Sequence, residues 1–320
     1  MSSDPQLPDI LDPGLPDSTG LRLLAVHAHP DDEASKGAAM MAAYVHAGAR
    51  VMVATATDGA MGDLNNPHYG ESIRVERDIA AVRYQEMADA AKILDIEHRW
   101  LGFRDSGFPE GDDPMAHLEP GCFADIALAD ATAPLIRLIR EFKPHVLVTY
   151  DEIGGYPHPD HLRTHAISME AYEKSGDPEA YPGTGEPWEI SKLYYDKAFN
   201  PDKFRAVHRA LIDSGQESPY ADRIEWYDRV EAGEDDPDAW RITNHKVTTQ
   251  LNAAKFLEYR DAALRAHRSQ VDTHGAFFFT PNEILREQWP WEDYVLIDSK
   301  VSTSLPEDDL FAGLRDTPLD

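Results

Sequence analysis

Three short runs of consecutive apolar residues limit most strongly the folds open to this chain of 320 residues. They lie in the segments Leu21–Ala28, Arg50–Thr57 and His145–Tyr150. A continuous apolar run of this length is typical of a strand buried on both faces of a parallel sheet. Between the runs, apolar residues recur at helical spacing, as in residues 37–45 and 80–94. This alternation predicts an α/β fold with a Rossmann-like, doubly wound and mostly parallel sheet.

The pattern divides the chain into three parts. Residues 1–20 carry four aspartates, several prolines and no Lys or Arg, which predicts a flexible leader. Residues 21–175 hold the alternating strands and helices and form the predicted core. Beyond this the pattern loosens, and we interpret residues 176–320 as a C-terminal α+β elaboration that completes a pocket. Within it, the apolar spacing of residues 247–264 predicts one long helix.

Charge and cysteine content narrow the class of protein. Thirty Lys+Arg against 58 Asp+Glu give a net charge of −28, which repels nucleic acid and anionic membranes, so we expect neither as a partner. The single cysteine, Cys122, leaves no internal disulfide. We find no secretory signal and no apolar stretch of the roughly 18 residues that a membrane helix needs. We therefore expect a cytoplasmic protein that acts on a small molecule, with a homo-oligomer left open.

Histidines and aspartates gather just after the first and third predicted strands. His29 and Asp32 follow the first strand, and His158 and His161 follow the third. Ligands of open parallel sheets bind at the carboxyl ends of the strands, where both segments would lie. Hydrolytic zinc sites use three His or Asp/Glu ligands and leave one position for water. His29, Asp32 and His161 supply such a set.

Two groups then remain beside the predicted metal. A carboxylate next to the metal, Asp31, can take a proton from water, and His158 or Tyr156 can stabilise an oxyanion or protonate a leaving amine. The alternative interpretation is structural: Asp31 and Asp32 would cap a helix, and His158 would be an ordinary loop histidine. Two His-Pro-Asp clusters at two strand ends favour the metal site.

The two clusters together resemble a known family. His29-Pro30-Asp31-Asp32-Glu33 combined with His158-Pro159-Asp160-His161 is similar to the motif pair of the LmbE/PIG-L zinc-dependent N-deacetylases. Further segments fit the branch of that family that acts on mycothiol compounds: Ser35-Lys36-Gly37, residues 102–107, Lys143-Pro144-His145, Gly154-Gly155-Tyr156, residues 192–195 and residues 260–267. The resemblance implies a Rossmann-like catalytic core and amide hydrolysis.

The resemblance also implies a role for each motif residue. His29, Asp32 and His161 would bind one Zn²⁺ ion, with Fe²⁺ as the alternative that ligand chemistry does not separate. Asp31 would be the general base and later pass its proton to the amine.

Further roles follow from the same resemblance. His158, held by Asp160, would stabilise the transition state, and Tyr156 would be a mobile oxyanion contact. Arg83 and Asp105 match family positions that hold the inositol and glucosamine hydroxyls.

For the substrate, the resemblance implies an amide of mycothiol. Lys36 matches the branch that cleaves mycothiol S-conjugates into glucosaminyl inositol and a mercapturate, where it would engage the substituted cysteine; its alternative is a solvated helix lysine. The enzymatic alternative is deacetylation of N-acetylglucosaminyl inositol in mycothiol biosynthesis, or another N-deacetylation of this type. The non-enzymatic alternative is a sugar- or inositol-binding protein.

Overall fold

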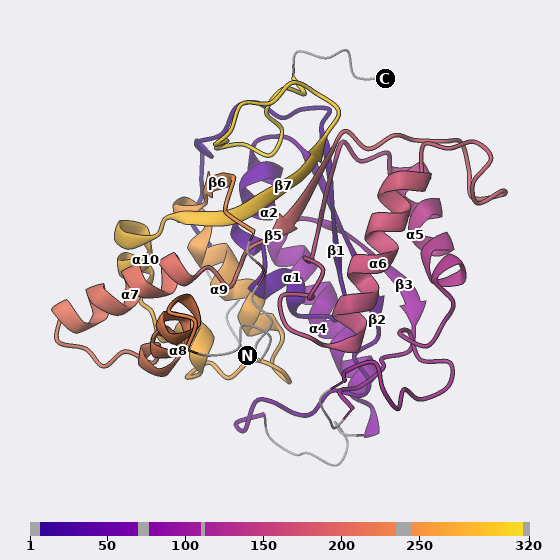
Figure 1. Ribbon diagram of the computed structural model, residues 1–320. Coiled ribbons are helices and arrows are strands. Elements are labelled where there is room, and N and C mark those ends of the chain that lie inside the picture. Colours follow the sequence, from indigo (N-terminus) through magenta and orange to yellow (C-terminus); the bar gives the residue numbers. More distant parts are fainter. Residues whose placement is uncertain (1–6, 70–76, 110–112, 235–242, 244, 316–320) are drawn as a thin grey trace.

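The computed structural model describes residues 7–69, 77–109, 113–234, 243 and 245–315. Within them, seven strands form a single sheet in the order β3-β2-β1-β4-β5-β7-β6 (Figure 1). The first five strands along the chain run parallel, and β7 runs antiparallel to both of its neighbours. In chain order the strands are β1 (Arg22–His27), β2 (Arg50–Thr57), β3 (Glu97–Phe103), β4 (Val146–Thr149), β5 (Lys192–Asp196), β6 (Thr249–Asn252) and β7 (Trp291–Ser299).

Helices cover both faces of this sheet, which confirms the predicted α/β class (Figure 1). In the described chain the α-helices are α1 (Asp32–Ser35), α2 (Ala38–His46), α4 (Ile79–Leu94), α5 (Leu128–Phe142), α6 (Pro159–Lys174), α7 (Pro201–Asp213), α8 (Ala221–Glu231), α9 (Leu257–Ala266) and α10 (Asn282–Gln288). Two 3₁₀ helices, η2 (Ala254–Phe256) and η3 (Ala276–Phe278), accompany them.

Alternate residues of the central strands explain the continuous apolar runs. Leu23 and Ala25 of β1 pack with α2, α4 and α9 on one face, whereas Leu24 and Val26 pack with α5 and α6 on the other. Because both faces are covered, each position along the strand has to be apolar. The predicted strands and the helices expected over residues 37–45 and 80–94 are thereby confirmed.

The order of the strands places a crevice next to β1. From β1 the chain proceeds to β2 and β3 on one side, and it later returns to β4 and β5 on the other side. Since β1 and β4 are parallel neighbours, with Ala25 opposite Val148, their carboxyl ends lie side by side. Such a switch point is where open α/β sheets bind ligands.

The long helix predicted over residues 247–264 is wrong in its first part. Residues 249–252 form β6, which pairs antiparallel with β7, and the helix begins only at Leu257. Thr248 and Thr249 are β-branched and suit a strand, and pairing with β7 outweighs the helical spacing of the apolar residues.

Part of the predicted leader packs against the core. Residues 7–20 belong to the predicted leader, and Leu7, Ile10 and Leu15 pack against the core while residues 1–6 lie outside the described chain. Among the described helices, none has the length and apolar character to cross a bilayer. The sheet runs without interruption from the core into the C-terminal part, because β5, β7 and β6 follow β4 in the strand order.

Candidate metal centre

The two histidine-aspartate motifs meet at the carboxyl ends of β1 and β4. His29 lies in the turn after β1, and Asp32 is the first residue of α1. His161 lies in the first turn of α6 and brings its Nε2 to 3.4 Å from Oδ2 of Asp32. Nδ1 of His29 lies 3.7 Å from the same oxygen. One ligand atom from each of these three residues falls within 4.8 Å of the others.

The hydrogen bonds of the two imidazoles show which atoms are free to bind a cation. Nδ1 of His161 lies 2.9 Å from the carbonyl oxygen of Gly154, and because a carbonyl only accepts, this nitrogen carries the hydrogen. Nε2 of His29 is likewise 3.2 Å from Oδ2 of Asp160. Nε2 of His161 is therefore a lone pair; it is buried and makes no hydrogen bond within the described chain.

Three possible ligand atoms thus converge on a buried point: Nδ1 of His29, Oδ2 of Asp32 and Nε2 of His161. A carboxylate oxygen and an imidazole lone pair that face each other in a buried space are unfavourable unless a cation or a proton lies between them. Burial lowers the pKa of His29, but hydrogen bonds to Asp160 and Asp32 outweigh it and raise this pKa to about 10, so without a metal Nδ1 of His29 holds a proton that a bound cation would replace. The same negative field suits a divalent ion, so these residues fit a metal.

Asp32 is held in place from several sides. The Tyr150 hydroxyl donates to its Oδ2 at 2.8 Å, and the backbone N–H of His29 donates at 3.0 Å. The Lys36 ammonium forms an ion pair with Oδ1. Burial raises the pKa of Asp32, but the charges of Lys36 and His161 outweigh it and hold this pKa well below its usual range. The carboxylate is therefore ionised and rigidly directed at the cation position.

Asp31 does not belong to the group of possible ligand atoms although it is the neighbour of Asp32. Its φ of 128° lies in a region that residues other than glycine rarely adopt, and such strain is typical of functional sites. Oδ2 lies 3.3 Å from Nη2 of Arg83, and the carboxylate lines an open cleft. Burial raises the pKa of Asp31, and Arg83 opposes this rise.

A buried ion pair supports the strained backbone of Asp31. The N–H of Asp31 donates to Oε2 of Glu33 at 3.0 Å, and Oε1 of Glu33 lies 2.6 Å from Nε2 of His267. His267 follows the last residue of α9 and is fully buried. Its part in this site was not predicted, and the only signal for it was its place in the matching segment 260–267.

His158 lies next to the predicted ligands. It caps α6, and its Nδ1 accepts the backbone N–H of Asp160 at 3.1 Å. Burial, together with the charges of His29 and His161, lowers the pKa of His158 to about 2. His158 is therefore neutral, and its Nε2 carries the hydrogen. The Tyr156 ring lies 4.4 Å from that of His161, between centroids, and borders the same cleft.

Asp160 acts on these histidines in two ways. Its backbone N–H donates to Nδ1 of His158. Its carboxylate accepts hydrogen bonds from Nε2 of His29 and, at 3.0 Å, from the backbone N–H of Ser106. The expected support of His158 by Asp160 is thus made by the main chain. The carboxylate instead orients His29, in the manner of the outer carboxylates that orient metal-binding histidines.

Arg83 and Asp105 lie at the site but are engaged by the protein itself. Arg83 is 3% exposed and donates to the carbonyl oxygens of Gly59 at 2.8 Å and Pro30 at 2.7 Å. Asp105 is 2% exposed and accepts the N–H groups of Met61 and Gly107. Both side chains therefore hold the backbone around the site.

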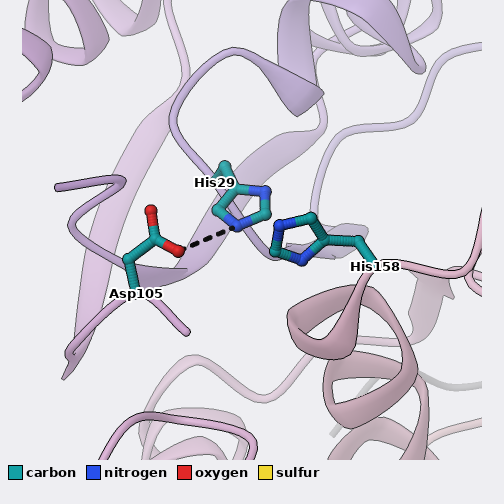
Figure 2. Close-up of side chains that lie close together, drawn as sticks. All are labelled: His29, Asp105 and His158. Atoms are coloured by element: carbon teal, nitrogen blue, oxygen red, sulfur yellow. Dashed lines mark ion pairs between the residues drawn. The ribbon is translucent and has the colours of Figure 1, made fainter. Parts of the chain in front are cut away.

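Asp105 also belongs to a second group of residues with metal-binding geometry. Figure 2 shows His29 between Asp105 and His158, with Oδ1 of Asp105 3.8 Å from Nε2 of His29. That nitrogen already has a hydrogen bond to Asp160, whereas Nδ1 of His29 faces Asp32. The set of His29, Asp32 and His161 therefore accounts better for the hydrogen bonds.

A cleft of about 600 Å³ opens from this centre. Asp31, Asp32, Lys36 and Tyr156 line one end of it. Its other walls come largely from residues 196–294, in the C-terminal part of the chain. A buried group of residues that could hold a cation, a neighbouring carboxylate and a substrate-sized cleft at a topological switch point are the features of a metal-dependent hydrolase.

Comparisons with known proteins agree with this class. Residues 24–172 match the family model described as PIG-L, GlcNAc-PI de-N-acetylase. The chain is 48% identical to the mycothiol S-conjugate amidase of Streptomyces coelicolor over 298 residues, which cover 92% of this chain and 98% of that protein. It is 39% identical to the 1D-myo-inositol 2-acetamido-2-deoxy-alpha-D-glucopyranoside deacetylase of Thermobispora bispora, covering 83% and 84% of the two chains.

Among solved structures, the N,N'-diacetylchitobiose deacetylase from Pyrococcus horikoshii shares the fold. Its TM-score is 0.53 at 17% identity, over 86% of this chain and 83% of that one. The chain belongs to the PIG-L/LmbE family. It is an enzyme of the amidase and N-deacetylase class in a metal-dependent family, as the sequence resemblance predicted.

Proposed function

We propose that this enzyme hydrolyses the amide bond of mycothiol S-conjugates and releases glucosaminyl inositol and a mercapturate. The observation that carries the proposal is the 48% identity to an amidase of this name, which extends over nearly the whole of both chains. Deacetylase relatives of similar coverage reach 35% to 39% identity. We further propose that residues 21–175 form the catalytic core and that residues 176–320 complete the substrate pocket.

We propose Zn²⁺ as the ion and His29, Asp32 and His161 as its ligands. The convergence of two imidazole nitrogens and one carboxylate oxygen supports this assignment, because such a mixed set suits zinc. When bound, zinc would supply a Lewis acid that polarises the amide carbonyl and lowers the pKa of water.

The proton transfers are assigned to Asp31. Its carboxylate lines the cleft beside the ligand set and is oriented by Arg83 and by its strained backbone. Asp31 takes a proton from the attacking water and later delivers it to the nitrogen of the departing amine. One water is consumed, the C–N bond breaks, and a carboxylic acid and a free amine leave.

Two donors face the oxyanion that forms during attack. His158 is a neutral imidazole with its hydrogen on Nε2, since Nδ1 accepts from Asp160. The Tyr156 hydroxyl borders the same cleft. Donors held in place before the reaction stabilise charge that develops in the transition state, and we assign His158 and Tyr156 this role.

A comparison of two substrates tests the proposed function. We expect kcat/KM for a mycothiol–bimane adduct to exceed that for N-acetylglucosaminyl inositol with the purified, zinc-loaded enzyme. The reverse order would make the enzyme a deacetylase of mycothiol biosynthesis. Binding of either compound without hydrolysis by the zinc-loaded protein would return it to the class of sugar- or inositol-binding proteins.

A further inference from the structure

Aromatic side chains line the part of the cleft that lies away from the metal ligands. We name this part the aromatic annex and define it by Phe199, Phe204, Tyr220, Phe277, Phe279 and Trp289. All six come from the C-terminal part of the chain: from the segments around α7, α8, η3 and α10. In Figure 1, α7, α8 and α10 lie together beside the sheet.

Several of these rings face solvent, which is unusual for side chains of their size. Phe277 is 49% exposed, Phe279 is 46% exposed and Phe199 is 38% exposed. Exposed aromatic rings that share one concave wall leave apolar surface in water, and such patches mark binding sites. Two other rings of the annex are held in place, because the Tyr220 hydroxyl lies 2.9 Å from Oγ1 of Thr280 and the Arg223 guanidinium lies over the Phe204 ring at 4.9 Å.

The annex begins directly beside the catalytic groups. A Cβ placed on Gly155 would lie 3.8 Å from two ring carbons of Phe199, so this ring packs against Gly155. Gly155 precedes Tyr156, one of the two proposed oxyanion donors. A substrate whose amide carbonyl faces Tyr156 therefore has the annex within reach of one of its two arms.

The same cleft also has polar lining residues. Asn65 and Gln270 line it and are joined by a hydrogen bond of 3.1 Å. The proposed substrate has one arm rich in hydroxyls, the glucosaminyl inositol, and one arm that carries the thioether substituent. Amide side chains form hydrogen bonds with hydroxyls, whereas aromatic walls bind apolar groups.

We infer that the aromatic annex binds the S-linked substituent of the substrate and selects conjugates in which this substituent is aromatic. This inference rests on the proposed function for the identity of the substrate. It assigns the discrimination among conjugates to Phe277 and Phe279, two rings outside the catalytic core. In the free enzyme about half of each ring is exposed, so substitution there removes contact with the ligand at little cost to folding.

The test compares S-benzyl with S-methyl mycothiol in the wild-type enzyme and in a double variant, Phe277→Ala with Phe279→Ala. We expect the wild-type enzyme to favour the S-benzyl conjugate about tenfold in kcat/KM. In the double variant this ratio should fall towards one. The matched control is Ile212→Ala, which removes an exposed apolar side chain of α7 outside the cleft lining and should keep the wild-type ratio. An unchanged ratio in the double variant would overturn the inference.

A binding experiment separates failure of the annex from failure of the proposed function. Calorimetry with S-benzyl-N-acetylcysteine and S-methyl-N-acetylcysteine measures the annex without requiring hydrolysis. Tighter binding of the benzyl compound by the wild-type protein, lost in the double variant, supports the annex even if no mycothiol conjugate is cleaved. Equal binding of the two compounds by the wild-type protein contradicts it, whatever the substrate proves to be.

Discussion

Glu33 and His267 form an ion pair of 2.6 Å in which both side chains are fully buried, although 234 positions separate them in the sequence. The pair joins α1, at the candidate metal centre, to the end of α9. Burial lowers the pKa of His267, but the charge of Glu33 outweighs it and raises this pKa above its usual value. Because Glu33 also accepts the N–H of Asp31, the C-terminal part of the chain holds the proposed base in position.

Removal of His267 tests this support. We expect His267→Ala to lower the free energy of unfolding by about 3–5 kcal/mol, because it leaves the Glu33 carboxylate buried without its partner. Urea unfolding followed by circular dichroism measures the change. His274→Ala is the matched control, since His274 lies in the loop after α9 with its side chain 80% exposed. Equal stability of the two variants would show that the pair contributes nothing.

Asp31 should be required for turnover but not for metal binding. We expect Asp31→Asn to lower kcat about 10²- to 10⁴-fold, the usual contribution of a general base. Asparagine also tolerates positive φ better than most residues, so the backbone is preserved. Metal analysis of the purified variant should give the wild-type zinc content. Wild-type turnover in this variant would assign the base to another residue.

Two adjacent glycines provide a matched pair for the position of His161. Gly154 and Gly155 have φ values of 73° and 72°, so an alanine meets the same backbone strain at either position. At Gly154, however, the added Cβ would lie 2.5 Å from Cβ of His161 and 2.9 Å from the backbone carbonyl oxygen of Tyr156. We expect Gly154→Ala to lose zinc affinity at least about tenfold relative to Gly155→Ala, measured by competition with a chelator. Similar affinities would show that this turn does not position the ligand.

The dependence of stability on pH should report on His145. Its Nδ1 accepts the N–H of Arg22 at 3.0 Å, and burial, with the charge of Arg22, lowers the pKa of His145 to about 4. The unfolded chain binds this proton near pH 6.5, so the contribution of His145 is fully present above pH 6.5 and is lost as the pH falls towards 4. His145→Asn keeps an acceptor but does not titrate, and we expect its free energy of unfolding to fall less steeply over this range. Parallel curves would contradict the assignment.

The sequence predicts the centre of the molecule better than its edges, for a physical reason. Strands β1, β2 and β4 are covered on both faces and read as continuous apolar runs. Strand β3 lies at the edge of the sheet, where its residues are only partly buried, so no such run marks it. Strand β6 pairs with β7, which lies about 40 residues further along the chain, so a local sequence pattern does not reveal the pairing. Its apolar spacing indicated a helix instead.

The same distinction holds for the site. The grouping of His29, Asp32 and His161 could be predicted because two local motifs follow two neighbouring parallel strands, whereas their binding of a metal stays a prediction. Two other contacts depend on side chains brought together only by folding: Arg83 reaches Asp31 from α4, and His267 reaches Glu33 from α9. No spacing in the sequence encodes these distances. For the same reason the aromatic annex, assembled from four separate segments, was not predicted.

We propose that His29, Asp32 and His161 hold one metal ion and that Asp31 does not bind it. The most direct measurement is a crystal structure of the zinc-loaded enzyme with anomalous diffraction recorded at the zinc absorption edge. We expect one anomalous peak bonded to Nδ1 of His29, a carboxylate oxygen of Asp32 and Nε2 of His161. A peak bonded instead to Nε2 of His29, Asp105 and His158, the group in Figure 2, would contradict it.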